Sequence, residues 1–294
     1  MTRPGSGVTS MGAVGAFLAG RSCPDAIFHV LCRAFGQASK AEEQATVPFS
    51  GGIVQHGYQC GMIWGAALAA GAHAHRLLGP GPQAEAAAIG AAQRLVESFR
   101  ATSGHVDCVD ITDTDGSSSN AKVFTTFFLK GRAIGCFRLA ARYGPAAYGE
   151  IGAALSGGRV EAPPDPVSCS AMLARRMGAS ERRVVMAAGL AGGIGLSGGA
   201  CGALGAALWI LGLGRIEGGD GRVEFKDPAA ADAIDRFMKI TDYAFECPEI
   251  AGRRFEDVRD HAAYLRGGGC SGIIEALGRS AVRPRDDPKR RRGA

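Results

Sequence analysis

The sequence of 294 residues has no Cys-x-x-Cys pair and no Cys-x-x-Cys-His segment, although it contains nine cysteines. The first absence weakens the case for dithiol/disulfide chemistry, and the second leaves no support for covalently attached c-type haem. The sequence also lacks long segments in which apolar and polar residues alternate, so a sheet-based fold is not indicated. The remaining pattern predicts a mainly helical protein.

Motifs of several common enzyme classes are absent as well. No Ser/His/Asp constellation, paired-carboxylate motif or phosphate-binding loop stands out, and we therefore assign no catalytic residues. Gly193-x-Gly195-x-x-Gly198 matches the dinucleotide fingerprint, but no β-α-β unit surrounds it. If the protein is an enzyme, an oxidoreductase or an electron-transfer subunit of one is the expected class.

Net charge is confined to the C-terminal end. Seven basic and two acidic residues from Arg279 onwards account for the whole net charge of +5, which leaves the rest of the chain about neutral. A nucleic-acid-binding face therefore has little support. We expect residues 279–294 to form a basic, disordered tail.

One long segment, Val184–Gly214, has no charged residue, which by itself is typical of a membrane span. Ten glycines interrupt it, so a buried helix–turn–helix is the better prediction and membrane contact is not expected. The apolar stretch Met11–Gly20 is short, and only one basic residue precedes it, so no clear export signal is present. We expect a cytoplasmic protein, in which nine cysteines favour metal or redox chemistry over disulfides.

A glycine-dense segment occurs twice. Residues 51–71 match residues 192–212 without gaps, with eight identities in 21 positions, among them Cys60-Gly61 and Cys201-Gly202. An internal duplication explains this match. Behind each Cys-Gly pair an apolar run predicts a buried helix.

Eight of the nine cysteines form two ordered sets. The steps between successive cysteines are 37, 48 and 28 residues in the first set and 32, 46 and 23 residues in the second. The first quartet is Cys23, Cys60, Cys108 and Cys136, and the second quartet is Cys169, Cys201, Cys247 and Cys270. Cys32 is left over, and we expect it to be a small buried core residue.

The first, second and fourth cysteines of each quartet are predicted to lie at helix starts, where free backbone amides surround the sulfur. Ser22 and Ser168 are candidate caps for the first of these helices. A helix N-terminus favours negative charge, so these thiols are expected to ionise readily. Gly61 and Gly202 permit close backbone approach, and we take them as cofactor-binding residues.

The join between the two copies is predicted within Ser156–Pro166, where glycines and prolines break regular structure. The expected organisation is a first helical module at 1–155 and a homologous second module at 156–278, each with a glycine-rich turn and four cysteines. Further helices are predicted near Gln83–Arg100 and Ala229–Tyr243, and short strands are considered at Val106–Ile111 and Val123–Leu129.

The ordered cysteines resemble those of a family of redox-active proteins named for its C–GCAxxG–C–C signature. Both copies have every signature cysteine and depart from the signature nearby, at Met62 in the first copy and Ala206 in the second. The family is similar to the iron–sulfur part of split-Soret cytochromes. The resemblance implies two iron–sulfur modules without the haem partner.

We therefore expect each quartet to bind a [2Fe–2S] or [4Fe–4S] cluster and the protein to exchange electrons with a redox partner protein. The alternatives are thiol/disulfide chemistry, with Cys60 and Cys201 as attacking thiols, and structural Cys₄ zinc sites. The wide spacing of the cysteines disfavours zinc, whose ligands usually come in close pairs. Two questions stay open: whether the chain forms a homo-oligomer, and whether each quartet is built within one copy or across both.

Overall fold

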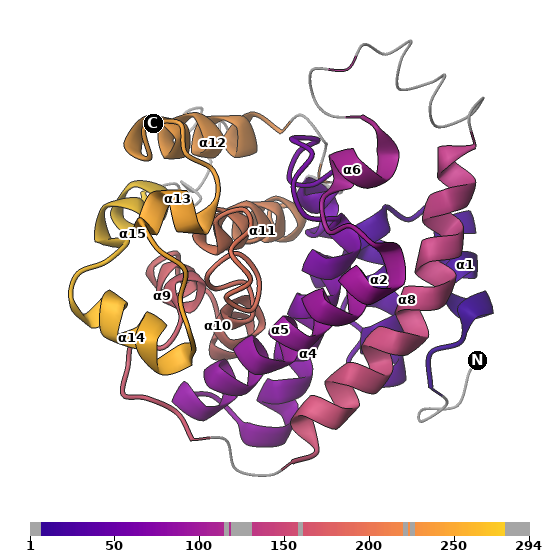
Figure 1. The fold of residues 1–294 in the computed structure, drawn as a ribbon, viewed down its shortest axis with the longest axis horizontal. Coiled ribbons are helices and arrows are strands. Elements are labelled where there is room, and N and C mark those ends of the chain that lie inside the picture. Colours follow the sequence, from indigo (N-terminus) through magenta and orange to yellow (C-terminus); the bar gives the residue numbers. More distant parts are fainter. Residues whose placement is uncertain are drawn as a thin grey trace, which may run out of the picture.

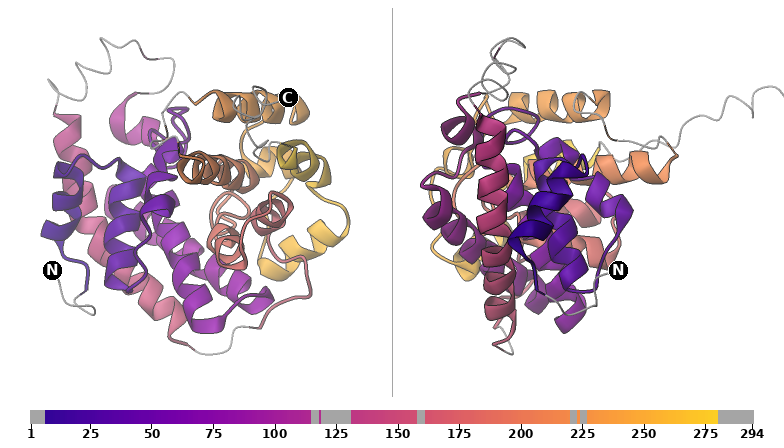
Figure 2. Two further views of the ribbon diagram at one scale, coloured as in Figure 1. Left: turned by 180° about the vertical axis from the view of Figure 1, so that it is seen from behind. Right: turned by 90° about the vertical axis from the view of Figure 1, so that its right-hand side faces the viewer.

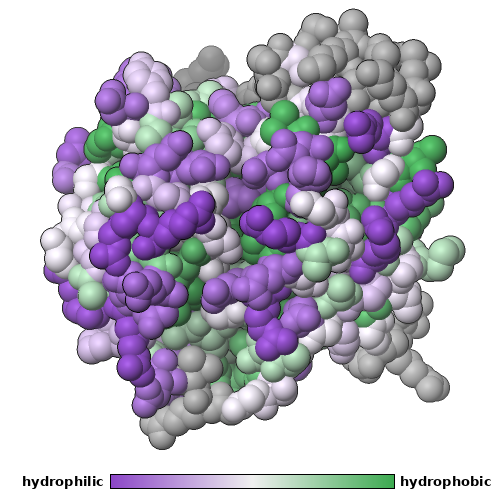
Figure 3. Space-filling model, in the orientation of Figure 1, coloured by the Kyte–Doolittle hydropathy of each residue, from purple (hydrophilic) through white to green (hydrophobic). Residues whose placement is uncertain are grey.

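The computed structural model describes residues 7–114, 118, 131–157, 161–219, 223 and 227–279. Every regular element within these residues is a helix, as predicted from the sequence. None of these helices is both long and apolar enough to cross a membrane. In the space-filling view of Figure 3, hydrophilic side chains are spread over much of the visible face. The strand considered at Val123–Leu129 and the tail beyond Arg279 lie outside the described residues.

The helices of the first copy lie mainly on the right of Figure 1. They are α1 (Ser10–Leu18), α2 (Cys23–Ala34), α3 (Lys40–Gln44), the 3₁₀-helix η1 (Val47–Phe49), α4 (Gly61–Leu78), α5 (Pro82–Ser103), α6 (Cys108–Thr112) and α8 (Arg132–Leu155). Of these, α4 and α5 extend across the lower centre of Figure 1. The apolar helix α4 packs against α2, α5 and α8, so it forms the centre of this copy. Cys32 on α2 is buried in the core, as predicted.

The helices of the second copy lie in the left half of Figure 1, and the view from behind in Figure 2 shows the same division. They are α9 (Cys169–Arg176), α10 (Glu181–Ala188), α11 (Gly202–Glu217), α12 (Pro228–Ile240), α13 (Cys247–Ala251), α14 (Val258–Arg266) and α15 (Ser271–Gly278). The uncharged segment Val184–Gly214 is buried and forms most of α10, a turn and most of α11. This confirms the predicted helix–turn–helix.

The two copies pack against each other through equivalent positions. A Cβ added to Gly71 of α4 would lie 2.5 Å from the carbonyl oxygen of Val185 in α10. Its counterpart in α11, Gly212, lies against Ala45 at the end of α3, where the corresponding distance is 3.1 Å. Because the contacts are reciprocal, a pseudo-twofold axis relates the copies. A single cluster of buried side chains runs through both of them.

Trp64 and Gly205 mark this axis. Each is the fourth residue after the second cysteine of its copy, and a Cβ on Gly205 would lie 2.2 Å from the Trp64 ring. A residue contacts its own counterpart only where the two copies meet at the axis. The Trp64 ring is fully buried and also stacks on Phe49, with ring centroids 5.0 Å apart. Such a large buried aromatic ring contributes strongly to packing.

Buried ion pairs also join the copies. Glu42 of α3 pairs with Arg182 of α10, and Glu85 of α5 pairs with Arg175 of α9. The two glutamates are 3% and 0% exposed. A buried carboxylate that loses an arginine partner is less well compensated, so these contacts disfavour other arrangements of the two copies.

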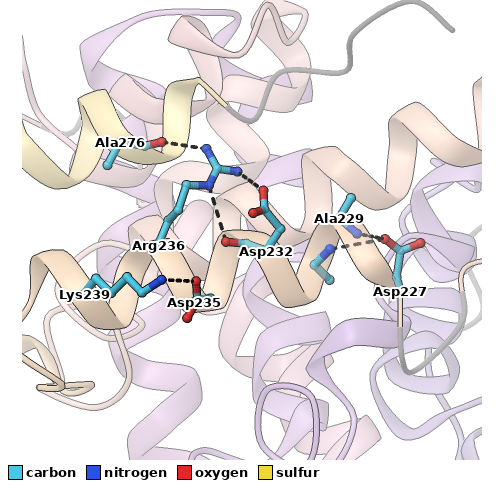
Figure 4. Close-up of polar contacts among 8 residues, drawn as sticks. Asp227, Ala229, Asp232, Asp235, Arg236, Lys239 and Ala276 are labelled. Atoms are coloured by element: carbon cyan, nitrogen blue, oxygen red, sulfur yellow. Dashed lines mark hydrogen bonds and ion pairs between the residues drawn. The ribbon is translucent and has the colours of Figure 1, made fainter.

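On the surface, α12 holds α15, the helix that follows Cys270. Asp227 caps α12 by accepting a hydrogen bond from the Ala229 N–H at 2.8 Å, as Figure 4 shows. From the same helix, the Arg236 guanidinium donates to the Ala276 carbonyl of α15 at 3.2 Å. The position of the fourth cysteine of the second quartet therefore depends on α12.

A buried histidine makes the stability of the first copy depend on pH. His73 of α4 is 7% exposed and stacks on Phe35, with ring centroids 4.0 Å apart. Burial and the nearby Arg76 guanidinium lower the pKa of His73 from 6.5 to about 4. Its contribution to stability is therefore complete above pH 6.5 and is lost as the pH falls towards 4.

We expect His73→Leu to remove up to about 3 kcal/mol of the fall in unfolding free energy between neutral pH and pH 4. Denaturant unfolding across this pH range, compared with the wild type, measures the difference. His105→Gln is the control, because the His105 side chain is 61% exposed. The same pH dependence in His73→Leu and wild type would contradict the prediction.

Candidate functional site

The four cysteines of the first quartet line one cavity of about 450 Å³. The other walls of this cavity are mainly apolar and include Phe17, Met62, Ile111, Phe137 and Leu139. All four cysteines are free thiols. The first quartet is thus assembled within the first copy and not across the pseudo-twofold axis.

The cysteines of the second quartet also lie close to one another. Burial raises the pKa of the Cys169 thiol, and the neighbouring Cys270, Cys201 and Cys247 raise it further. Cys201 and Cys270 act in the same way on the buried Cys247. These four are free thiols as well, and they belong to the second copy alone.

Seven of the eight cysteines lie at the first residue or the N-cap of a helix. Cys23, Cys108, Cys169 and Cys247 begin α2, α6, α9 and α13, and Cys60, Cys201 and Cys270 are the N-caps of α4, α11 and α15. Cys136 differs from the prediction, because α8 already begins at Arg132.

The two predicted serine caps have different outcomes. Ser168 caps α9 by accepting a hydrogen bond from the Ala171 N–H at 3.1 Å, as predicted. The hydroxyl of Ser22 makes no such bond to α2, so that prediction is wrong. Pro24, the second residue of α2, has no N–H and therefore removes one of the usual donors to a capping side chain.

In the first copy, two backbone hydrogen bonds hold the second and third cysteines side by side. The Cys60 N–H donates to the carbonyl oxygen of Val106 at 2.9 Å, and the Cys108 N–H donates to that of Tyr58 at 2.7 Å. Each cysteine is thus fixed through its own backbone.

The second copy repeats this arrangement. The Cys201 N–H donates to the carbonyl oxygen of Phe245 at 3.0 Å, and the Cys247 N–H donates to that of Gly199 at 2.8 Å. The duplication therefore extends to the backbone contacts that bring the second and third cysteines together.

The residues that precede these cysteines form single antiparallel bridges, Gln59 with Asp107 and Ala200 with Glu246. The strand considered at Val106–Ile111 is therefore wrong. Pairing there is limited to one bridge, because α6 begins directly after it.

A left-handed turn precedes the second cysteine of each copy. The φ angle is positive at five consecutive residues, Gly51–Gln55 and Gly192–Leu196. Glycine adopts this conformation at little cost, whereas each L-residue with a side chain, such as Ile53 or Ile194, costs about 1–2 kcal/mol. The glycine pattern thus belongs to a turn between helices and not to a dinucleotide-binding β-α-β unit.

The first glycine of each turn directs its backbone N–H at the first cysteine of the quartet. Gly51 acts on Cys23 and Gly192 on Cys169, in each case lowering the pKa of the thiol. Amides in the first turns of α4 and α11 act in the same direction on the second cysteines. The predicted amides around the sulfurs are therefore present.

Burial nevertheless outweighs these amides. Burial raises the pKa of Cys136 to about 11 and that of Cys201 to about 12, and it raises the pKa of Cys60 well above its usual value. The expectation that helix starts would make Cys60 and Cys201 ionise readily is therefore wrong. Burial disfavours the thiolate more strongly than the amides favour it, which weakens the case for these residues as attacking thiols.

Gly61 and Gly202 are positions of very close packing. A Cβ on Gly61 would lie 2.8 Å from the Phe49 carbonyl oxygen and 2.9 Å from Cys23 Sγ. A Cβ on Gly202 would lie 1.8 Å from the Leu190 carbonyl oxygen. These glycines let each helix start approach the segment before the left-handed turn. Their contact with a cofactor stays a prediction.

Within the described residues, no three His, Cys, Asp or Glu side chains converge as the ligands of a metal ion. The thiols of the first quartet face a shared cavity instead. The sulfur atoms of the first quartet therefore lie around one cavity, but they do not converge on the position of a single metal ion.

Gln59 links the two copies, a role that was not predicted from the sequence. Its side-chain amide donates to the Gly193 carbonyl at 3.0 Å and accepts from the Ala200 N–H at 2.8 Å. The signal that was available is the mismatch between copies, because the counterpart of this polar residue is an alanine.

We expect Gly202→Ala to lower the free energy of unfolding by at least about 3 kcal/mol, because backbone would have to move to admit the Cβ. Thermal unfolding of the purified variant measures the effect. Gly90→Ala is the control, because a Cβ on this glycine of α5 meets nothing within 4 Å and alanine favours the helix. Equal stability of the two variants would contradict the prediction.

The chain matches the model of one known protein family. The family model described as "Putative redox-active protein (C_GCAxxG_C_C)" matches the chain twice, at residues 21–142 and 168–282. Neither the curated proteins nor the solved structures contain a significant match. Each of the two matched segments contains one complete quartet.

The signature corrects our assignment of the departures at Met62 and Ala206. It has alanine directly after the second cysteine and glycine four residues after that cysteine. Gly61 and Gly202 therefore replace the alanine, and Trp64 replaces the glycine in the first copy.

The two matches cover more than half of the chain, and they repeat in the order in which the structure repeats its turns, bridges and helix starts. The protein belongs to the C_GCAxxG_C_C family of putative redox-active proteins, as a tandem duplication of the family module.

Proposed function

We propose that each quartet binds one iron–sulfur cluster and that the protein transfers electrons to and from a redox partner. The observation that carries this proposal is the cavity of the first copy, which all four cysteines line. Thiolates from four cysteines are the usual ligands of [2Fe–2S] and [4Fe–4S] clusters. Membership of a redox-active family supports the same chemistry.

The arrangement of the sulfur atoms favours a cluster over a single zinc ion. A zinc ion requires four sulfurs at about 2.3 Å from one point. A cluster of several irons holds its cysteine sulfurs farther apart, with the inorganic core between them. Thiols that surround a cavity of about 450 Å³ suit the cluster better.

A bound cluster would supply one-electron oxidation and reduction. The chain itself would hold each cluster through the four cysteines of one quartet, and in the first copy it would surround the cluster with apolar side chains such as Phe17 and Phe137. These side chains exclude water. The reduction potential of an iron–sulfur cluster depends on its exposure to solvent and on the hydrogen bonds to its sulfur atoms. The backbone amides of Gly51 and Gly192 are placed to act on the ligand sulfurs.

We expect anaerobically purified protein to contain iron and acid-labile sulfide and to show visible absorption that bleaches on reduction. Cys201→Ala should retain about half of the iron, because the first quartet is complete without it. Cys32→Ala is the matched control, since this buried cysteine belongs to neither quartet and should leave the iron content unchanged. A colourless, iron-free protein after anaerobic reconstitution, or stoichiometric zinc in its place, would overturn the proposal.

A further inference from the structure

Gln59 belongs to the first copy, yet both polar groups of its side chain serve the second copy. The side chain lies in the interface between the copies, and the residue is 2% exposed. Its Nε2 donates to the Gly193 carbonyl at 3.0 Å, and its Oε1 accepts from the Ala200 N–H at 2.8 Å. Its counterpart in the second copy is Ala200, whose methyl group makes no hydrogen bond. The first copy therefore stabilises the second through this side chain, and the second copy has no equivalent side chain that stabilises the first.

The two bonds hold the backbone that positions two cysteines of the second quartet. Ala200 directly precedes Cys201, and its bridge to Glu246 places Cys247 beside Cys201. Gly193 lies in the left-handed turn Gly192–Leu196, from which the chain runs on to Ala200 and Cys201.

The backbone of the second copy packs closely against the amide of Gln59 at Gly199. A Cβ on Gly199 would lie 1.6 Å from Gln59 Nε2, so the missing side chain at this glycine makes space for the amide. The turn that Gln59 contacts includes Ile194 and Leu196 in the left-handed conformation. Such strained residues persist only where their surroundings hold them. Gln59, a residue of the first copy, provides two of the hydrogen bonds that stabilise this turn and the segment after it.

We propose that Gln59 is a positioning residue for the second quartet, so that the first copy prepares the metal site of the second. This inference rests on the proposed function, since it assigns to Gln59 a part in the binding of the second cluster. Groups that orient metal ligands from one shell further out typically contribute about 10- to 100-fold to metal affinity.

Gln59→Met tests the proposal, because methionine has similar length and no amide. The variant is combined with Cys60→Ala, which leaves only the second quartet complete, and with Cys201→Ala, which leaves only the first. After anaerobic reconstitution, the iron that each protein retains against a chelator is measured. We expect Gln59→Met to weaken iron retention about 10-fold or more in the Cys60→Ala background and to change it little in the Cys201→Ala background.

Glu42→Gln is the matched control in both backgrounds. It disturbs another buried contact between the copies, that of Glu42 with Arg182, without contacting the left-handed turn. Hydrogen exchange of metal-free protein gives a second readout, and Gln59→Met should speed exchange in the segment 192–201. A general loss of stability would instead lower iron retention equally in both backgrounds.

Equal iron loss in the two backgrounds, or none in the Cys60→Ala background, would overturn the role of Gln59 and leave the proposed function standing. Absence of iron from both Cys60→Ala and Cys201→Ala, together with an iron-free wild type, would overturn the proposed function and this inference with it.

Discussion

The left-handed turns Gly51–Gln55 and Gly192–Leu196 are the backbone conformation on which the cysteine quartets and the interface between the copies depend. Several residues with side chains adopt an unfavourable conformation there, and the turns persist because the surrounding hydrogen bonds and packing hold them. Each turn directs one amide at the first cysteine, and the chain leaving it pairs with the segment before the third cysteine. The turn of the second copy also packs on α5 of the first, where a Cβ on Gly195 would lie 2.1 Å from the backbone nitrogen of Gln93. One local conformation thus fixes both the quartets and the interface.

The two copies agree in backbone geometry more closely than in residue type. Val54 and Gly195 occupy the same position and both have positive φ, although valine strongly disfavours it. The duplicated bridges form from Gln59 and Asp107 in one copy and from Ala200 and Glu246 in the other. Backbone hydrogen bonds carry this geometry, and they depend little on the identity of the side chains. For this reason the side chains could diverge towards the interface while the cysteines stayed in place.

Much of the local structure could be predicted from the sequence. Apolar runs behind Cys60 and Cys201 indicated buried helices, and the repeated Cys-Gly pair revealed the duplication. Ser22 shows the limit of such rules, because the adjacent Pro24 removes a donor that a capping side chain needs. The ionisation of Cys60 could not be predicted from its helix start alone, since burial by distant segments decides the direction of the pKa. Gln59 was missed for the same reason, because its partners lie in the other copy.

The pairing of Trp64 with Gly205 has a consequence for how the halves can combine. Two first copies would set one indole ring against another at the axis, and two second copies would leave the space of the ring empty. Neither half is self-complementary, so each recognises the other half better than a copy of itself. The covalent link thus keeps together two halves that fit each other, and not themselves, at this face.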